Sequence, residues 1–226
     1  MSAPVVMIMA KAPVPGQVKT RLASTVGPDF AARLAAAALL DTLDACEQAF
    51  GIGRCHLALA GDLQAVQDDE LLARLDRWTV HHQRGDGLAE RIANAHRDVH
   101  AVAGAPVVQV GMDTPHVSPD VLSHVSDVVG GGVPVLGLAE DGGWWVLATA
   151  APGLVDGLEQ VPMSTPGTGR ATWDLLHSQD AGVVEAPTMR DVDVVADAVH
   201  VAALAPATRF ARSWLAGHDV RAGSAT

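Results

Sequence analysis

The sequence predicts an α/β fold in which a mostly parallel, mixed sheet carries helices on both faces. Short runs of branched apolar residues alternate along the chain with segments whose apolar residues recur at helical spacing. The chain has 226 residues, 49% of them hydrophobic, which suffices for one large core, and no repeat or long linker divides it. We therefore expect a single domain over residues 1–217 and a flexible tail at 218–226.

The individual elements follow from local signals. A buried strand is expected over residues 5–10, and Gly27-Pro28 opens a helix that Gly51 ends. The later expected elements are strands near 55–60 and 78–83, a helix over 88–99, a strand at 107–110, a helix at 119–129, strands at 133–138 and 144–148, a helix near 168–177, a strand near 183–186 and a helix from about 194 to 204. This alternation is typical of parallel strands joined by helical crossovers.

Composition narrows the functional class. No apolar run is long enough to span a bilayer, and the N-terminal run is too short for a secretory signal, so we expect a cytoplasmic protein without a membrane partner. Cys46 and Cys55 fit no metal-ligand spacing and are expected to be reduced thiols. The net charge of −11 would repel the backbone of DNA or RNA, so nucleic acid is not an expected partner.

The basic loop after the first strand is the strongest chemical signal. Lys11 and Lys19 are the only lysines in the chain, Arg21 follows them, and no acidic residue precedes Asp29. A compact ammonium group suits a phosphate oxygen, and open α/β sheets bind ligands at the carboxyl ends of their strands. The alternative is a solvated connection that happens to be basic.

A second signal is the aspartate that ends the strand at 107–110. In Gly111-Met112-Asp113, the carboxylate of Asp113 would stand at the carboxyl edge of the sheet, beside the basic loop if the two strands are neighbours. Such a group can hold Mg²⁺, which takes one or two protein carboxylates and completes its shell with water and phosphate oxygens. The alternative is a turn stabilised by the aspartate side chain before Pro115.

A third signal, Asp191-Val192-Asp193, stands just before the last predicted helix. Asp193 could cap that helix, or it could be a second metal ligand.

A fourth signal is Glu140-Asp141-Gly142-Gly143-Trp144-Trp145. The paired glycines allow backbone to approach a ligand, and adjacent tryptophans on a strand must point to opposite faces. One indole would then pack in the core while the other lines a cleft. A plain hairpin before a buried strand is the alternative.

Two histidines look structural. His96 and His100 are one helical turn apart and could bind a metal ion together. They flank the apolar stripe and have no third metal ligand nearby, so we expect them to lie on a solvated helix edge.

Taken in order, these segments resemble the uncharacterised bacterial glycosyltransferase-like family of the nucleotide-diphospho-sugar transferase superfamily, which has the three-layer GT-A fold. The resemblance spans about residues 4–204, and parts of it are also similar to phospholactate guanylyltransferases. The segments that carry it are 11–22, 83–85, 87–91, 111–115, 140–145, 164–166 and 191–193.

The resemblance implies a role for each matching residue. Nucleotide binding would fall to Lys11, Gly16, Lys19, Thr20, Arg21, Arg84, Glu90 and Arg91, and acceptor binding to Glu140, Asp141, Gly142, Gly143, Trp144, Trp145, Ser164 and Thr165. Asp113 and Asp193 would bind Mg²⁺ or Mn²⁺, with Asp191 as an alternative to Asp193, and Asp113, Lys19 and Arg21 would form the catalytic group.

We therefore expect a transferase that binds a nucleotide sugar or nucleoside polyphosphate and a small-molecule acceptor. Glycosyl transfer is the leading hypothesis. The alternatives are nucleotidyl transfer with release of pyrophosphate, as in guanylyl transfer to a small phosphorylated acid, and a nucleotide-binding module without turnover.

Overall fold

In the computed structural model, which describes residues 2–179 and 182–223, seven strands form one sheet in the order β3-β2-β1-β4-β6-β5-β7. All neighbouring pairs are parallel except those that β6 makes with β4 and β5. The strands are β1 (Val5–Lys11), β2 (Cys55–Ala60), β3 (Thr79–His82), β4 (Val107–Gly111), β5 (Val135–Ala139), β6 (Trp144–Thr149) and β7 (Val184–Met189). The predicted mixed, mostly parallel sheet is confirmed.

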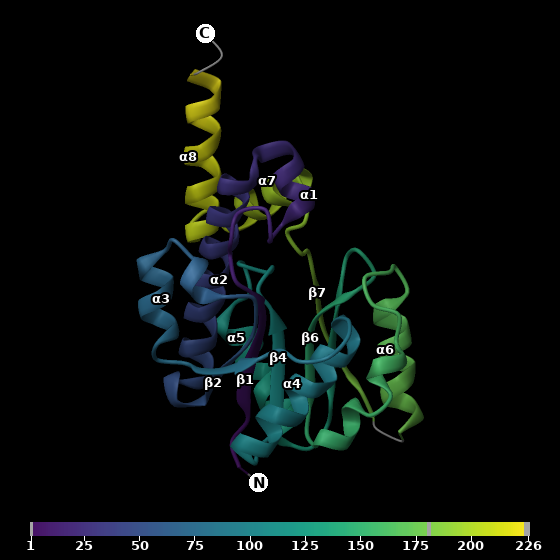
Figure 1. Ribbon diagram of the computed structural model, residues 1–226. Coiled ribbons are helices and arrows are strands. Elements are labelled where there is room, and N and C mark those ends of the chain that lie inside the picture. Colours follow the sequence, from purple (N-terminus) through teal and green to yellow (C-terminus); the bar gives the residue numbers. More distant parts are fainter. Residues whose placement is uncertain (1, 180–181, 224–226) are drawn as a thin grey trace.

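Helices cover both faces of this sheet, as expected (Figure 1). On one face lie α2 (Pro28–Phe50), α3 (Asp69–Leu75) and α5 (Pro119–Gly130), and on the other lie α4 (Leu88–Ala103) and α6 (Thr168–Ser178). Each face buries its own apolar cluster, so the sheet is the middle layer of three. None of the helices in the described part of the chain has both the length and the apolar character needed to cross a membrane.

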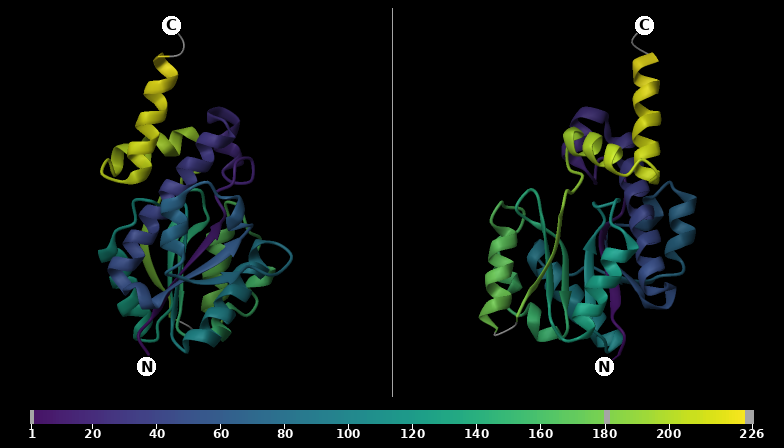
Figure 2. Two further views of the ribbon diagram at one scale, coloured as in Figure 1. Left: turned by 60° about the vertical axis from the view of Figure 1, so that its left-hand side comes forward. Right: turned by 180° about the vertical axis from the view of Figure 1, so that it is seen from behind.

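A third apolar cluster stands above the carboxyl ends of the strands. There α1 (Thr20–Val26), α7 (Val195–Leu204) and α8 (Arg209–Gly223) pack against the first half of α2, as the views from two further sides also show (Figure 2). The rings of Phe30 and Trp214 stack with centroids 6.3 Å apart. The carboxylate of Asp41 accepts the backbone N–H groups of Arg209 and Phe210, each at 2.9 Å, and so fixes the start of α8.

Every predicted helix and strand is present, but α1, α3 and α8 were not anticipated. The local signal for α3 is Asp68, whose side chain accepts the N–H of Leu71 as a helix cap. For α8 the signal is tertiary, since its first N–H groups are satisfied by Asp41 from α2. The first residues of the expected tail, 218–223, belong to α8, and residues 224–226 lie outside the described residues.

Buried polar groups in the α4 layer correct one expectation. Cys46 and Cys55, in the apolar cluster on the opposite face, are buried free thiols, as predicted. The solvated edge expected for His96 and His100 is wrong, because both side chains are buried and share the hydroxyl of Thr149 at 3.0 Å each. A helical stripe cannot distinguish a buried polar partner on the sheet from solvent, and here the sheet supplies that partner.

These buried histidines predict an acid-sensitive fold. Burial lowers the pKa of His96 to about 3, whereas a histidine in an unfolded chain titrates near about 6.5. Between these values the unfolded chain binds a proton that the folded chain does not. As the pH is lowered below about 6.5, the free energy of unfolding should therefore decrease, and this residue alone should contribute about 1.4 kcal/mol per pH unit. Urea unfolding across that range should give a flatter pH dependence for His96→Gln than for the wild type.

The matched control is His124→Gln, which alters an exposed histidine and should keep the wild-type pH dependence. An equal slope for His96→Gln and the wild type would contradict the assignment.

Candidate active site

The basic loop after β1 turns inward through Lys19. This residue adopts the left-handed conformation with φ 48° and ψ 46°, which is uncommon for a residue with a side chain. Its side chain is only 8% exposed, and its Nζ atom lies 2.7 Å from Oδ1 of Asp113. It also donates a hydrogen bond to the carbonyl oxygen of Val192. A single ammonium group therefore joins the loop, the end of β4 and the segment before α7.

The sheet topology makes this contact possible. Strands β1 and β4 are neighbours, in register from Val5 with Val107 to Met9 with Gly111. The loop after β1 and Asp113 after β4 consequently leave the sheet side by side, which is the arrangement expected from the sequence if the two strands were neighbours. The carbonyl oxygen of Asp113 in turn accepts the N–H of Val192 at 3.0 Å, which brings the segment 191–193 to the same edge.

Carboxylates crowd around the ammonium group. Burial, and then the nearby charge of Asp113, raise the pKa of Asp191 to about 7, with smaller contributions from Asp141 and Asp193 and an opposing one from Lys19. Asp193 instead faces outward and its Oδ2 atom lies 2.5 Å from Nη1 of Arg21. Asp191 is thus the carboxylate most closely coupled to Asp113.

The carboxylate oxygens around Asp113 decide whether a metal ion fits at this site. Oδ1 of Asp113 is buried and lies beside Lys19 Nζ, yet no donor in the described residues makes a well-aligned hydrogen bond to it. Within the described ranges, no group of three or more His, Cys, Asp or Glu side chains is placed to hold a metal ion. Two adjacent carboxylates with open positions are what Mg²⁺ commonly takes, because water and phosphate complete its shell. The residues present therefore fit such an ion.

A cavity of about 840 Å³ opens between these groups and the β5–β6 hairpin. Many of the predicted site residues line it: Lys11, Lys19, Thr20, Arg21, Asp113, Asp141, Gly143, Trp144, Trp145, Ser164, Thr165 and Asp193. Met9, Leu88, Ile92, Gln109 and Met163 also line it on the α4 side of the sheet, where Met9, Ile92 and Gln109 are buried and Leu88 is exposed. The structure thus brings together residues from both ends of the sequence.

The tryptophans behave as the strand alternation predicts. Trp145 is 1% exposed and packs in the core, where its Nε1 donates to the carbonyl of Pro187 at 2.8 Å. Trp144 is half-buried on the cavity side, with its Nε1 3.2 Å from the hydroxyl of Thr172. One indole is thus available to a ligand.

Other predicted nucleotide ligands do not reach the cavity. Arg84 forms a two-point pair with Asp98, Glu90 accepts the N–H of Asp86, and Arg91 donates to the carbonyl of Gly85. These contacts hold the loop before α4 together. Gly16 is exposed on the outside of the basic loop, where its φ of 77° serves the turn.

On the acceptor side, Glu140 and Gly142 also lie off the cavity lining. Glu140 pairs with Arg190, and Nε of that arginine lies 2.7 Å from Oε2. Gly142 has φ 89°, and an added Cβ would come within 2.2 Å of the carbonyl oxygen of Pro166. Its absent side chain therefore lets the hairpin close on the segment 164–166.

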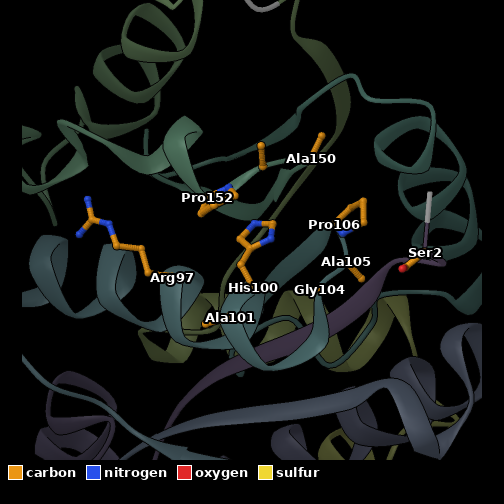
Figure 3. Close-up of a pocket in the computed structure, with 10 residues that line it drawn as sticks. Ser2, Arg97, His100, Ala101, Gly104, Ala105, Pro106, Ala150 and Pro152 are labelled. Carbon is orange, nitrogen blue, oxygen red and sulfur yellow. The ribbon is translucent and has the colours of Figure 1, made fainter.

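A second cavity, of about 510 Å³, lies at the opposite edge of the sheet between the start of β4 and the end of β6 (Figure 3). Its charged lining residue, Arg97, is already paired with Asp156 and Glu159. None of the predicted site residues lines it.

Sequence reasoning missed Gln109 and gave Asp191 only as an alternative. A signal for Gln109 was present, because a glutamine interrupts the apolar run Val107-Val108-Gln109-Val110. Asp191 could not be ranked above Asp193, since the distinction depends on which way each side chain turns from an irregular segment.

The sheet order and the position of the cavity define a nucleotide-diphospho-sugar transferase-like fold. A protein from Desulfovibrio desulfuricans G20, provisionally named a nucleotide-diphospho-sugar transferase, aligns with a TM-score of 0.76 at 24% identity over 97% of this chain and 96% of its own. Rv0371c from Mycobacterium tuberculosis H37Rv, in complex with manganese, aligns at 0.55 and 20% identity over 88% of this chain and 98% of its own. A cytidylyltransferase from Leptospira borgpetersenii aligns at 0.57 and 11% identity over 99% and 95%.

The chain belongs to the bacterial family described as "Uncharacterized protein conserved in bacteria (DUF2064)", whose profile matches residues 39–165. The match includes Asp113 and the β5–β6 hairpin, while the basic loop precedes it. No curated protein matches the sequence. The predicted family resemblance is confirmed, and the structural alignments establish the fold.

The tight approach at Gly142 yields a stability prediction. Gly142→Ala should lower the free energy of unfolding by at least about 2 kcal/mol more than Gly132→Ala, because overpacking adds to backbone strain. Gly132 is the matched control, since it has φ 95° but open space where a Cβ would stand. Urea unfolding of both variants measures the difference, and equal losses would mean that the contact with Pro166 contributes nothing.

Proposed function

We propose that this protein is a metal-dependent transferase that binds a nucleotide sugar and passes its glycosyl group to a small, uncharged acceptor. The observation that carries the proposal is the division of the cavity into two chemically different walls. In the described residues its cationic lining consists of Lys11, Lys19 and Arg21, from the end of β1, the loop after it and the start of α1. Asp141 and Trp144 line the facing side. The first wall suits a diphosphate. The second suits a hydroxyl-rich neutral molecule, through stacking and hydrogen bonds.

Lys19 and Arg21 differ in burial and would therefore bind phosphate in different ways. Lys19 is buried and held by Asp113, so it supplies a fixed positive charge at the sheet edge. Arg21 is 72% exposed and its pair with Asp193 is open to water, so it can turn to a phosphate at little cost. Together they would position the diphosphate and stabilise the charge that develops as it leaves.

A divalent cation would be held by Asp113 and Asp191, with Asp193 kept apart by Arg21. The manganese complex of Rv0371c, a protein of the same fold, supports the assignment of such an ion. When bound, the ion would neutralise negative charge on phosphate oxygens. The raised pKa of Asp191 comes first from burial and then from the charge of Asp113, and an added cation would offset both effects.

In the proposed reaction the bond between the anomeric carbon and the phosphate oxygen breaks. The electron pair leaves with the nucleoside diphosphate. An acceptor hydroxyl oxygen forms the new bond to the anomeric carbon, and its proton passes to Asp141, the carboxylate of the acceptor wall.

Nucleotidyl transfer is the second candidate. The fold shared with a cytidylyltransferase favours it, as does the single aspartate after β4 in place of an Asp-x-Asp pair. In that reaction the basic loop would hold a triphosphate and pyrophosphate would leave.

The metal assignment predicts the behaviour of Asp113→Asn. Because Asp113 would meet phosphate through the cation, this variant should lose the metal-dependent part of nucleotide affinity while it keeps its fold. Calorimetric titration of nucleoside diphosphate with and without Mg²⁺ measures that part. Asp156→Asn, which removes a surface carboxylate paired with Arg97, is the control and should match the wild type. Equal metal dependence in Asp113→Asn and the wild type would refute the site.

Glycosyl transfer and nucleotidyl transfer release different products, a nucleoside diphosphate in the first case and pyrophosphate in the second. We expect sugar nucleotides with Mg²⁺ to raise the melting temperature more than the matching triphosphates, and incubation with neutral polyol or sugar acceptors to release nucleoside diphosphate. Release of pyrophosphate from a triphosphate, with a small phosphorylated acid as acceptor, would instead establish nucleotidyl transfer. Binding without any turnover would indicate a module that only binds nucleotides.

A further inference from the structure

Gln109 occupies the inner end of the cavity and takes no part in the mechanism above. It lies on β4, on the face covered by α4, and is 2% exposed. The buried apolar side chains of Met9 and Ile92 line the same cavity from β1 and α4. A polar amide is costly at such a place unless it has partners.

One end of the Gln109 amide is already held. Its Oε1 atom lies 2.8 Å from Nε2 of His96, whose Nδ1 lies 3.0 Å from the hydroxyl of Thr149. That hydroxyl lies 3.0 Å from Nε2 of His100, the histidine that Figure 3 shows in the second cavity. A buried row of hydrogen bonds therefore crosses the protein from one cavity to the other.

The direction of these bonds follows from their chemistry. A carbonyl oxygen only accepts, so His96 donates through Nε2 to Gln109. The buried, neutral imidazole of His96 must then accept at Nδ1 from the hydroxyl of Thr149. The carbonyl of Gln109 is thus fixed, and its NH₂ group is the end left for the cavity. Across residues 2–179 and 182–223, no hydrogen-bond acceptor reaches that group.

The surroundings define what could satisfy this donor. Asp113, Asp141 and Asp191 border the same cavity, and its inner end is apolar. A charged phosphate or carboxylate group would be both repelled and desolvated there. A neutral oxygen on a ring, either a nucleobase carbonyl or a sugar hydroxyl, would meet neither penalty.

We propose that Gln109 is a specificity-determining residue that donates a hydrogen bond to a neutral ring oxygen of the substrate, with His96 as the positioning residue that fixes its amide. This inference rests on the proposed function for the presence of a nucleotide. It adds which part of the substrate enters the inner cavity and which residue recognises it.

The test compares ligands with and without a ring. Inorganic pyrophosphate, nucleoside diphosphates of the four bases and the matching sugar nucleotides are titrated with Mg²⁺ into the wild type and Gln109→Glu. The variant keeps the bond from His96 but turns an acceptor toward the cavity. We expect it to bind pyrophosphate like the wild type and to bind its best ring-bearing ligand at least about tenfold more weakly. A loss already present with diphosphates identifies a base carbonyl, and a loss confined to sugar nucleotides identifies a sugar hydroxyl.

Two further variants protect the result against misfolding. Gln83→Glu is the matched control, because the amide of Gln83 donates to the carbonyls of Ala10 and Ala58. It should reduce stability and leave the ratio of nucleotide to pyrophosphate affinity unchanged. The double variant His96→Leu with Gln109→Met removes both partners together, should fold, and should lose the same selectivity as Gln109→Glu.

The outcomes separate the two proposals. If the wild type binds none of these ligands, the proposed function fails and this inference fails with it. If the wild type binds nucleotides but Gln109→Glu and the double variant keep its selectivity, or lose pyrophosphate affinity to the same extent, the role of Gln109 is refuted while the proposed function stands.

Discussion

The buried ammonium group of Lys19 is the contact on which the arrangement of the site depends. It forms an ion pair with the carboxylate of Asp113 and donates a hydrogen bond to the carbonyl of Val192, residues that lie 94 and 173 positions further along the chain. A lysine at 8% exposure needs such partners, because an unpaired buried charge is strongly disfavoured. The left-handed backbone at this residue is what turns the side chain inward.

The electrostatics around Lys19 are unbalanced in a way that suits a ligand. Burial is the main reason that the pKa of Asp191 lies near 7, and the charges of Asp113, Asp141 and Asp193 raise it further. Carboxylate repulsion of this kind is relieved by a cation, and a cation in turn attracts phosphate. Under the proposed function, the basic loop and the acidic edge are complementary parts of one site for a polyanion.

The inner end of the cavity, around Gln109, is apolar rather than charged. Its walls are apolar and its polar groups are few and held in place, as Gln109 is by His96. Such sites select by the shape and hydrogen-bonding pattern of neutral groups. Under the two proposals, the protein would bind the charged phosphates at the carboxyl edge of the sheet and a neutral ring oxygen of the substrate at the inner end of the cavity.

The sequence by itself determined what depends on local spacing: the alternating strands and helices, the basic loop, the position of Asp113 and the opposite faces of Trp144 and Trp145. Only the tertiary structure decided which of these meet. The placement of β1 beside β4, the exclusion of Arg84 from the cavity and the burial of His96 all depend on contacts between residues far apart in the chain. Periodicity along a chain records which face of an element is apolar, but it does not record which partner that face will meet.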